Sequence, residues 1–401
     1  MCGSELNSEP LMIFENMPAS AQDIPEACEL SEDRGIELRL FKCPFCGLFQ
    51  FDCEPVDYYR DVIRAVGLSE TMRELRRADY RHMIEDYGLK DGRFLECGCG
   101  RGEFLQVLKE VSQKAYGTEN NRQAAEAAEK DIGKGHILCG FPETGEEIFF
   151  GGGFDCFFSF NFLEHQPDPR SMLRSMYKNL REGGYGLITV PSFEYILKEG
   201  RYYEFIRDHI ANYSLEALER LCIISGFEVL EKGYIGIGDT LRVIVRKPEY
   251  PDAKTEIKLE EDGELSEGIE RLKKNRSLIG ESVRAFTDGL KEKGMKLCLW
   301  GAGHQGFTIA STTSLKEEAS YIIDSAPFKQ GKFAPASHIP IVGPEHFRKE
   351  PSQAILIVAP GYAVEINATI RRSFSGLKDE EGREIKAPRV FKLSSDHIEE
   401  M

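Results

Sequence analysis

The chain has 401 residues, of which 41% are hydrophobic and 29% charged, a composition that supplies apolar cores for two or three globular domains. The net charge of -16 argues against nucleic acid as the main partner, because phosphate backbones bind clustered Lys and Arg. No apolar run reaches the roughly 18 residues of a membrane span, and no secretory signal opens the chain. We therefore expect a cytoplasmic protein that acts on a small molecule, without a membrane partner, as a monomer or homodimer.

Shifts in pattern along the chain predict four segments: 1–55, 56–248, 249–294 and 295–401. The first is short, turn-rich and cysteine-bearing. The second alternates helical and strand patterns, which is typical of a parallel α/β sheet. The third combines Pro251 and a charged run with apolar residues at near-helical spacing over 265–293, so we predict a linker and a bridging amphipathic helix. In the fourth the α/β pattern resumes, with strands expected at 296–300, 320–324 and 354–359.

Cysteine usage separates two roles, because a chain of this length is not a disulfide scaffold. Cys43 and Cys46 are clustered, as metal ligands are. Other cysteines lie in apolar runs, and we expect them to be core residues: Cys139, Cys156, Cys222 and Cys298.

A glycine-rich loop lies early in the second segment. A buried strand expected at 93–96 ends in Glu96, and Gly98, Gly100 and Gly102 follow at alternate positions before a helical apolar face. Strand, glycine turn and helix together are typical of a cofactor loop, since glycines let the backbone turn sharply and approach a ligand. The spacing E-x-G-x-G-x-G differs from the G-x-G-x-x-G of pyrophosphate-binding dinucleotide sites.

Further elements follow this loop in a recognisable order. A strand at 115–119 ends in Glu119, whose carboxylate suits two ribose hydroxyls, and a strand at 135–139 leads to Phe141. A strand at 154–160 runs into Asn161 and Phe162, and a glycine turn then leads into a strand that ends near Pro191. This order resembles the class I S-adenosylmethionine (SAM)-dependent methyltransferases. The alternative is a nucleotide-free α/β domain whose glycines serve packing only.

The resemblance implies that SAM is the cofactor. Glu96 and the backbone of Gly98 and Gly100 would hold the methionine end, in a turn that Gly102 completes. Later loops supply the other expected cofactor contacts: Glu119 for the ribose, Phe141 for the adenine, and Asn161 and Phe162 where SAM meets the acceptor.

A second glycine loop, Gly301-Ala302-Gly303-His304-Gln305-Gly306, follows the strand at 296–300 and is a literal G-x-G-x-x-G. Asp324 ends the next strand, near the offset of about 20 residues at which dinucleotide sites place an acid. Taken alone, this motif indicates NAD. The alternatives are a site for the nucleotide part of a substrate and a purely structural loop.

The flanking sequence favours the substrate. Residues 321–332, 338–342 and 360–366 resemble the C-terminal domain of the nucleotide-sugar C-methyltransferases, which also have a zinc-ribbon-like N-terminal piece and a central SAM domain. The resemblance implies a nucleotide-linked 4-keto sugar that is methylated at C3. The expected substrate contacts are Gly301, Gly303, His304, Gln305, Asp324, Lys329 and Lys332. The predicted fold class is therefore α/β: a small N-terminal zinc-ribbon-like module, a central class I methyltransferase Rossmann-like domain and a second Rossmann-like domain.

The Cys43-Pro44-Phe45-Cys46 turn presents two thiolates, whereas structural zinc takes four ligands. The resembling family has a first C-x-x-C-G-S, and Cys2-Gly3-Ser4 matches its second half. We therefore expect Cys2, Cys43 and Cys46 as zinc ligands, and the family's remaining cysteine would precede Met1. The fourth ligand is then an upstream residue, Cys28, Cys53 or water; the alternative is a metal-free knuckle held by packing.

Carbon methylation beside a ketone needs a base and a group that steadies the enolate oxygen. His209 lies just before a helix expected at 215–225 with Ser214 as its N-cap, and histidine titrates near neutral pH. This stretch resembles the family's E-H-x-x-Y-F-S, which implies His209 as base. His165, after the strand at 154–160, is the second candidate. The alternative is a structural histidine that bonds backbone.

The same stretch also departs from the family. Ile206 and Asn212 stand where the family has tyrosines, and Tyr202, Tyr203 or Tyr213 are candidates to replace them. Residues 63–66 replace a stretch that is richer in tyrosine and serine in the family. These changes affect the acceptor side. Besides base-assisted C-methylation, two functions stay open: O- or N-methylation of a related sugar or small molecule, and non-catalytic binding of SAM or a nucleotide.

Overall fold

The computed structural model describes residues 2–61, 69–249, 263–374, 376–378 and 382–401. The charged linker after Pro251 and the altered patch at 63–66 lie outside these ranges. The chain forms two compact units, each built from separate stretches: Met1–Glu9, Phe41–Tyr195 and His209–Glu261 make unit 1, and Pro10–Leu40, Ile196–Asp208 and Asp262–Met401 make unit 2. The four predicted segment boundaries stay predictions. Among the described helices, none is long and apolar enough to cross a bilayer.

Unit 1 is built around a seven-stranded sheet in the order β10-β11-β8-β7-β4-β5-β6. Its strands are β4 (Phe94–Cys97), β5 (Ala115–Glu119), β6 (Ile137–Cys139), β7 (Phe154–Phe160), β8 (Leu180–Pro191), β10 (Glu228–Ile235) and β11 (Thr240–Arg246). The five strands from β8 to β6 are parallel, and β11 runs antiparallel to its two neighbours β8 and β10 at one edge. The strand order reverses between β4 and β7, and open α/β sheets bind ligands in the crevice at such a reversal.

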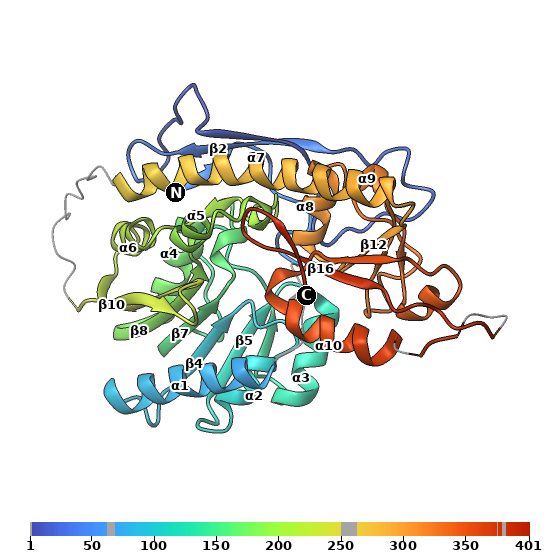
Figure 1. Cartoon of the computed structure of the whole chain (residues 1–401). Coiled ribbons are helices and arrows are strands. Elements are labelled where there is room, and N and C mark those ends of the chain that lie inside the picture. The colour runs from blue at the N-terminus through green and yellow to red at the C-terminus, as the bar shows by residue number, and fades with distance from the viewer. Residues whose placement is uncertain (1, 62–68, 250–262, 375, 379–381) are drawn as a thin grey trace. The chain divides into compact units, whose positions relative to one another are not determined.

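Helices cover both faces of this sheet because its central strands are apolar on both sides, as in β7 with Phe157 and Phe158. In Figure 1, α1, α2 and α3 lie on one face and α4 and α6 on the other. Each face has its own core, one around Phe158, Tyr80 and Leu105 and one around Phe157, Met172 and Leu218. The helices of this unit are α1 (Glu70–Asp86), α2 (Glu103–Leu108), α3 (Arg122–Ile132), η1 (Leu163–His165), α4 (Pro169–Asn179) and α6 (Leu215–Ile224).

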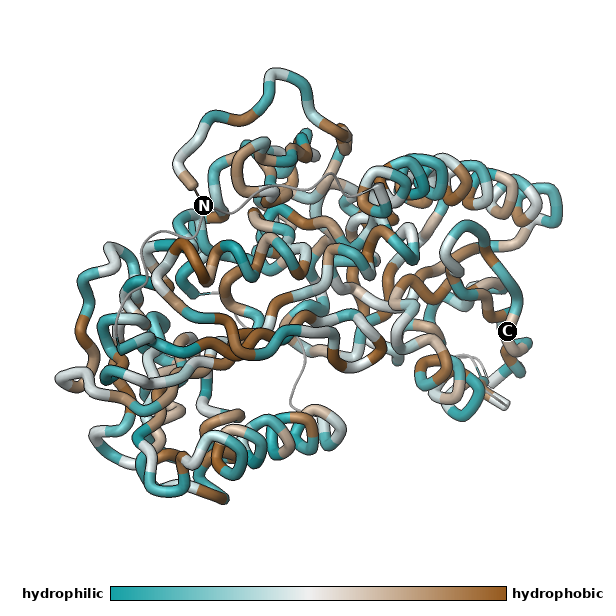
Figure 2. Tube along the Cα trace, turned by 90° about the vertical axis from the view of Figure 1, so that its left-hand side faces the viewer, coloured by the Kyte–Doolittle hydropathy of each residue, from teal (hydrophilic) through white to brown (hydrophobic). Residues whose placement is uncertain are grey.

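The N-cap that the sequence predicts for α6 is present in the structure. The Ser214 hydroxyl accepts a hydrogen bond from the Ala217 N–H at 3.1 Å, which confirms Ser214 as the N-cap of α6. Along the tube in Figure 2, helices alternate brown and teal residues, the pattern of helices with one apolar face. Buried Cys156, Cys222 and Cys298 confirm their expected core role, but Cys139 is exposed, so that prediction was wrong. Cys139 is the last residue of the three-residue edge strand β6, and no residue of this strand is fully buried.

Short strands flank the cysteine turn of the N-terminal region. In unit 1, β3 (Phe49–Phe51) pairs antiparallel with β9 (Ala211–Asn212). In unit 2, β1 (Met12–Met17) pairs antiparallel with β2 (Ile36–Lys42), whose last residues pass into unit 1. Helix α5 (Phe193–Glu199) likewise passes from unit 1 into unit 2.

Unit 2 contains a six-stranded sheet in the order β14-β13-β12-β15-β16-β17, parallel except for β17. Its strands are β12 (Leu297–Trp300), β13 (Ala319–Ile323), β14 (Ile341–Val342), β15 (Ala354–Ile357), β16 (Arg389–Leu393) and β17 (Ile398–Glu400). Its helices are η2 (Tyr202–Glu204), α7 (Gly263–Glu292), α8 (His304–Thr312), α9 (Leu315–Glu318), η3 (Pro344–Arg348), η4 (Pro360–Tyr362) and α10 (Ala363–Phe374). The sequence prediction of a second Rossmann-like sheet is confirmed.

The expected amphipathic helix is α7. It buries most of the apolar residues whose spacing predicts it, whereas Leu278 and Phe286 are only partly buried; the buried ones are Leu265, Ile269, Leu272, Ile279, Val283 and Leu290. Close packing of β12 against α8 depends on Gly306. A Cβ on Gly306 would lie 2.3 Å from the Gly301 carbonyl oxygen and 2.9 Å from Val358. By contrast, a Cβ on Gly303 would meet nothing within 4 Å.

We expect Gly306→Ala to lower the free energy of unfolding by about 1–3 kcal/mol, because the backbone of the loop must shift to admit the methyl group. Urea denaturation, followed by the fluorescence of Trp300 at the end of β12, measures this change. The matched variant Gly303→Ala should be close to neutral. Equal losses in both variants would contradict the packing role of Gly306.

Candidate active site

The first glycine loop is shaped by a contact with the segment that follows β7. Gly98 has φ of +73°, and a Cβ on it would lie 2.5 Å from the ring of Phe162. The N–H groups of Gly98 and Cys99 both donate to the Thr118 carbonyl oxygen, at 3.0 and 2.9 Å. The loop after β4 therefore lies against the loop after β7, and glycine is required where they touch.

Glu119, the expected ribose ligand, holds this loop from the end of β5. Its two carboxylate oxygens accept hydrogen bonds from the N–H groups of Gly100 at 2.9 Å and of Asn121 at 2.8 Å. Burial raises the pKa of Glu119, although these backbone donors oppose the shift. Each oxygen keeps a lone pair beyond its backbone bond, so the carboxylate can still accept from ribose hydroxyls.

Glu96, Gly100 and Gly102, which are expected around the methionine part of SAM, lie on β4 and in the loop that follows it. Glu96 is 2% exposed on β4, in the crevice where the strand order reverses. Gly102 starts α2 with φ of +82°, and a Cβ there would lie 3.1 Å from Ile132 and 3.2 Å from Ala128. Left-handed backbone and close packing thus explain this glycine without a ligand contact, whereas Gly100 has φ of +57° and room for a Cβ.

The expected adenine contact Phe141 lies in an aromatic group that the sequence analysis did not assemble. Its ring centroid is 5.7 Å from that of Phe162 and 5.8 Å from that of Tyr59. The Arg60 guanidinium lies 4.6 Å from the Tyr59 ring, and Asp61 accepts a 2.8 Å hydrogen bond from the Asn120 amide. Residues 59–61 therefore border the SAM crevice. Their signal was the pair Tyr58-Tyr59, which could not be placed from sequence alone.

The three residues expected to carry chemistry come together behind Phe162. The rings of His165 and His209 lie edge to face, with centroids 4.8 Å apart and an interplanar angle of 71°. His165 is 7% exposed, whereas His209 is partly exposed. The Tyr213 hydroxyl is buried and donates to the Leu163 carbonyl oxygen at 3.4 Å. The structure also brings Glu164 into this group, a residue that the sequence analysis passed over.

In unit 2, the second glycine loop is held by Asp324. The carboxylate accepts hydrogen bonds from the N–H groups of Ala302 at 2.8 Å and Ala326 at 2.9 Å. Lys329 also links the glycine loop to Asp324: its ammonium group lies 3.3 Å from the Asp324 carboxylate and 2.7 Å from the Ala302 carbonyl oxygen. Lys332 instead lines a hollow beside Phe333 and His346.

His304 and Gln305, also expected at this loop, both contact Glu204. The Gln305 amide donates to Glu204 at 2.8 Å, and the His304 Nε2 lies 3.3 Å from the other carboxylate oxygen. Burial opposes ionisation of Glu204, but the bonds from His304 and Gln305 prevail and lower its pKa. Gly303 stays exposed, with no neighbour that requires a glycine. A glycine without a packing reason leaves the backbone open to a ligand.

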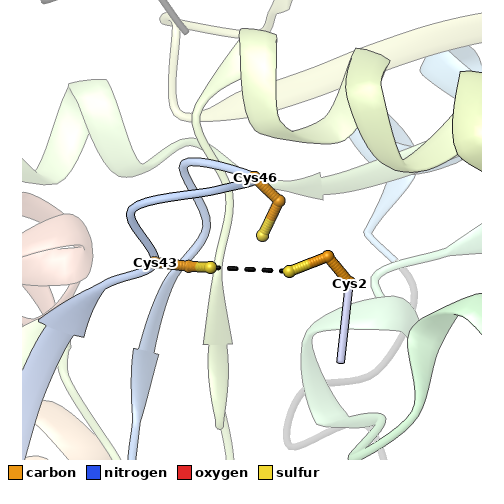
Figure 3. Close-up of side chains that lie close together, drawn as sticks. All are labelled: Cys2, Cys43 and Cys46. Atoms are coloured by element: carbon orange, nitrogen blue, oxygen red, sulfur yellow. Dashed lines mark hydrogen bonds between the residues drawn. The ribbon is translucent and has the colours of Figure 1, made fainter. Parts of the chain in front are cut away.

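The three expected zinc ligands lie together in unit 1. The Sγ atoms of Cys2 and Cys43 are 3.6 Å apart, and those of Cys2, Cys43 and Cys46 all lie within 4.8 Å of one another (Figure 3). The turn is a knuckle, in which the Cys43 N–H donates to the Leu48 carbonyl oxygen at 2.9 Å. Three thiols at this separation suit zinc with one further ligand. Among the described residues, neither Cys28 nor Cys53 joins the cluster.

Comparison with known proteins agrees with this geometry. Residues 68–232 match the family described as a methyltransferase domain, and residues 238–377 match the C-methyltransferase C-terminal domain. The C-methyltransferase NovU of Streptomyces niveus is 27% identical over 295 residues, which cover 71% of this chain and 70% of that protein.

Similar solved structures include a SAM-dependent methyltransferase of Thermotoga maritima, described as a possible histamine N-methyltransferase. It is 23% identical, covers 44% of this chain and 93% of its own, and has a TM-score of 0.35. The N-methyltransferase NodS of Bradyrhizobium japonicum is 17% identical, covers 45% of this chain and 99% of its own, and has the same TM-score of 0.35.

The reversed parallel sheet with its glycine loop and Glu119, together with the methyltransferase match over this sheet, identifies unit 1 as a class I SAM-dependent methyltransferase domain. SAM is thus the cofactor of this enzyme. Because the second matched region extends from unit 1 into unit 2, the chain resembles C-methyltransferases that join such a domain to a dedicated C-terminal domain.

We expect Gly98→Ala to weaken binding of S-adenosylhomocysteine about tenfold or more, because the new methyl group must displace Phe162 from the loop. Isothermal titration calorimetry measures the affinity. Gly151→Ala is the matched control, since Gly151 has φ of +77° but its Cβ would meet nothing within 4 Å. A similar loss of affinity in the control would assign the effect to backbone strain.

For the cysteine cluster, we expect about one zinc ion per chain in protein purified without chelators. Cys43→Ser should remove the zinc and lower the melting temperature, because two thiolates cannot hold a structural ion. Elemental analysis and thermal denaturation measure both effects. Cys28→Ser, at an exposed cysteine outside the cluster, should change neither. Protein that is fully stable and free of zinc would show that packing alone holds the knuckle.

Proposed function

We propose that this cytoplasmic enzyme transfers a methyl group from SAM to a carbon beside the keto group of a nucleotide-activated sugar. The observation that supports this proposal most directly is the edge-to-face pair of His165 and His209. His165 follows closely on Asn161 and Phe162, and the Phe162 ring packs against the SAM loop at Gly98. Methylation at oxygen or nitrogen can use the lone pair already present, whereas a C–H carbon must first lose a proton to a base.

We assign the proton-accepting role to His209. It is partly exposed, whereas His165 lies behind it and is 7% exposed. A base must reach the proton that it abstracts, and the imidazole titrates in the pH range where the enzyme works. In this assignment His165 orients His209. Tyr213 holds η1 in place through the Leu163 carbonyl oxygen rather than touching the acceptor.

Asn161 is suited to steady the enolate oxygen. It is exposed at the end of β7 with φ of +48°, an uncommon conformation for a residue other than glycine. Its side-chain oxygen accepts a 3.0 Å hydrogen bond from the Thr189 hydroxyl, which orients the amide and leaves its nitrogen as a donor. When bound, SAM supplies the methyl group and a neutral thioether as leaving group. The chain itself supplies the base, the oxygen donor and the alignment.

The second glycine loop supports a nucleotide-linked acceptor. It joins a parallel strand to the N-terminus of α8, a place where backbone N–H groups bind phosphate. Gly303 is exposed there, and Lys329 adds a positive charge beside the loop. Release of His304 and Gln305 from Glu204 would make both side chains available to a diphosphate. Zinc at Cys2, Cys43 and Cys46 would act structurally, since three thiolates leave little room for a substrate.

The test is a thermal-shift panel of nucleotide sugars in the presence of S-adenosylhomocysteine, followed by mass spectrometry of the hits with SAM. We expect stabilisation by a 4-keto nucleotide sugar and a product heavier by one methyl group. We also expect His209→Ala to keep its affinity for S-adenosylhomocysteine and to lose about 100-fold or more in turnover. His397→Ala, at an exposed histidine, is the control.

Two results would contradict the proposal. Full turnover in His209→Ala would show that another residue is the base. Absence of any methylated nucleotide sugar, with stabilisation by nucleotides alone, would indicate a non-catalytic binding protein.

A further inference from the structure

A buried carboxyl group lies beside the two histidines. Glu164 is the central residue of η1 and is 2% exposed. Its Oε1 lies 4.0 Å from the His165 Nε2, and its Oε2 has no hydrogen-bond partner within the described part of the chain. One ligand atom from each of Glu164, His165 and His209 lies within 4.8 Å of the others. The acid is thus close enough to both imidazoles to affect their protonation.

A buried carboxylate is costly unless a positive charge balances it, and removing its partner costs several kcal/mol. Burial raises the pKa of Glu164 to about 8, against the backbone hydrogen bond of Glu164 itself, so this acid keeps its proton near neutral pH unless a cation lies beside it. An imidazolium at 4 Å would provide the missing positive charge. The acid and the two histidines therefore titrate as one coupled group, in which the Glu164 carboxylate stabilises a protonated imidazole.

We propose that Glu164 is a positioning residue that stabilises, through the His165–His209 pair, the proton that this pair takes from the acceptor carbon. The inference rests on the proposed function, since it requires a reaction that removes a proton. The C–H bond breaks and its proton passes to the His209 imidazole. The electron pair left on carbon forms the new bond to the methyl group, while the sulfur–methyl bond of SAM breaks and its electrons stay on the thioether sulfur. The His209 imidazolium, within 4.8 Å of Glu164 and beside His165, is stabilised by the carboxylate until His209 releases the proton to solvent.

The remaining neighbours do not provide this charge. Tyr213, just after β9, is a neutral phenol, and burial raises its pKa well above the usual value, with Glu164 as a further cause. On α4, Asp168 caps the helix, and Arg174 and Lys178 pair with Glu146. On β8, Arg181 pairs with Asp155, Glu182 pairs with Lys247, and the Tyr185 ring packs on Tyr87. The two histidines are thus the cationic partners that the structure places nearest the acid.

The decisive variant is Glu164→Gln, which keeps the shape and removes the charge. Histidines labelled with ¹³C report their protonation by NMR, and His165→Asn and His209→Asn assign the two signals. We expect at least one of the pair to gain its proton about one pH unit or more lower in Glu164→Gln than in the native protein, because a nearby carboxylate raises an imidazole pKa. Unchanged titration of both histidines would overturn the proposal.

The chain offers a matched control on its surface. His82 lies 2.9 Å from Glu231 in the same unit, and both are partly exposed. Glu231→Gln should shift only the His82 signal and leave the buried pair unchanged. A shift of His165 or His209 in this control would show that their titration responds to the overall charge of the protein, which would overturn the specific role of Glu164.

Turnover separates this inference from the proposed function. With an accepted sugar, Glu164→Gln should lower kcat about tenfold, leave KM and S-adenosylhomocysteine affinity unchanged, and move the pH profile with the histidine titration. Glu164→Asp, which restores a carboxylate, should recover part of kcat. Native kcat in Glu164→Gln overturns the inference while leaving the function intact. If no nucleotide sugar is methylated, the proposed function is wrong. The histidine titration needs no substrate, so it still tests the role of Glu164.

A bound cation is the competing account of the same three groups. One ligand atom of each residue lies within 4.8 Å of the others, so two imidazoles and a carboxylate are also a ligand set that a divalent cation accepts. Loss of turnover after dialysis against a chelator, with recovery on Mn²⁺ in the native protein but not in Glu164→Gln, would assign the cluster to a metal and overturn the proposal.

Discussion

The contact between Gly98 and Phe162 is the constraint on which the active site depends. It joins the loops at the ends of β4 and β7, the two strands between which the sheet order reverses. Because the Phe162 ring occupies the space of a Cβ, the glycine loop and the segment from Asn161 to His165 adopt their conformations together. The cofactor loop and the histidine pair are consequently parts of one packed structure, in which a change on one side affects the other.

Both units use an acid in the same way. Glu119 accepts from the Gly100 N–H, and Asp324 accepts from the Ala302 N–H, so each carboxylate draws its glycine loop toward the end of the neighbouring strand. These acids are the ones that the sequence assigns to ligand binding. Their structural bonds explain how a loop rich in glycine keeps one conformation before a ligand arrives. Glu204 adds a third acid, which holds His304 and Gln305 at the second loop.

Prediction from sequence worked best where local pattern controls the outcome. Strands β4 to β8, β12, β13 and β15, the N-cap at Ser214 and the apolar face of α7 follow from residue spacing and were confirmed, whereas β10, β11, β14, β16 and β17 were not predicted. Cys139 was misplaced because its apolar neighbours do not reveal that β6 is an edge strand. Glu164 was missed because no local signal distinguishes a buried glutamate from an exposed one, and the contact of Tyr59 with Phe141 joins residues that are distant in sequence.

The sequence by itself determined the two α/β patterns, the two glycine loops with their acids, the cysteine knuckle, and the resemblance that gave the cofactor. These features are periodic or consist of residues within one short segment, so spacing is sufficient to find them. Only the tertiary structure decided that Cys2 meets Cys43 and Cys46, and that the buried Glu164 and His165 lie beside the partly exposed His209. Burial and proximity arise when distant segments pack, and the protonation of these side chains depends on that packing.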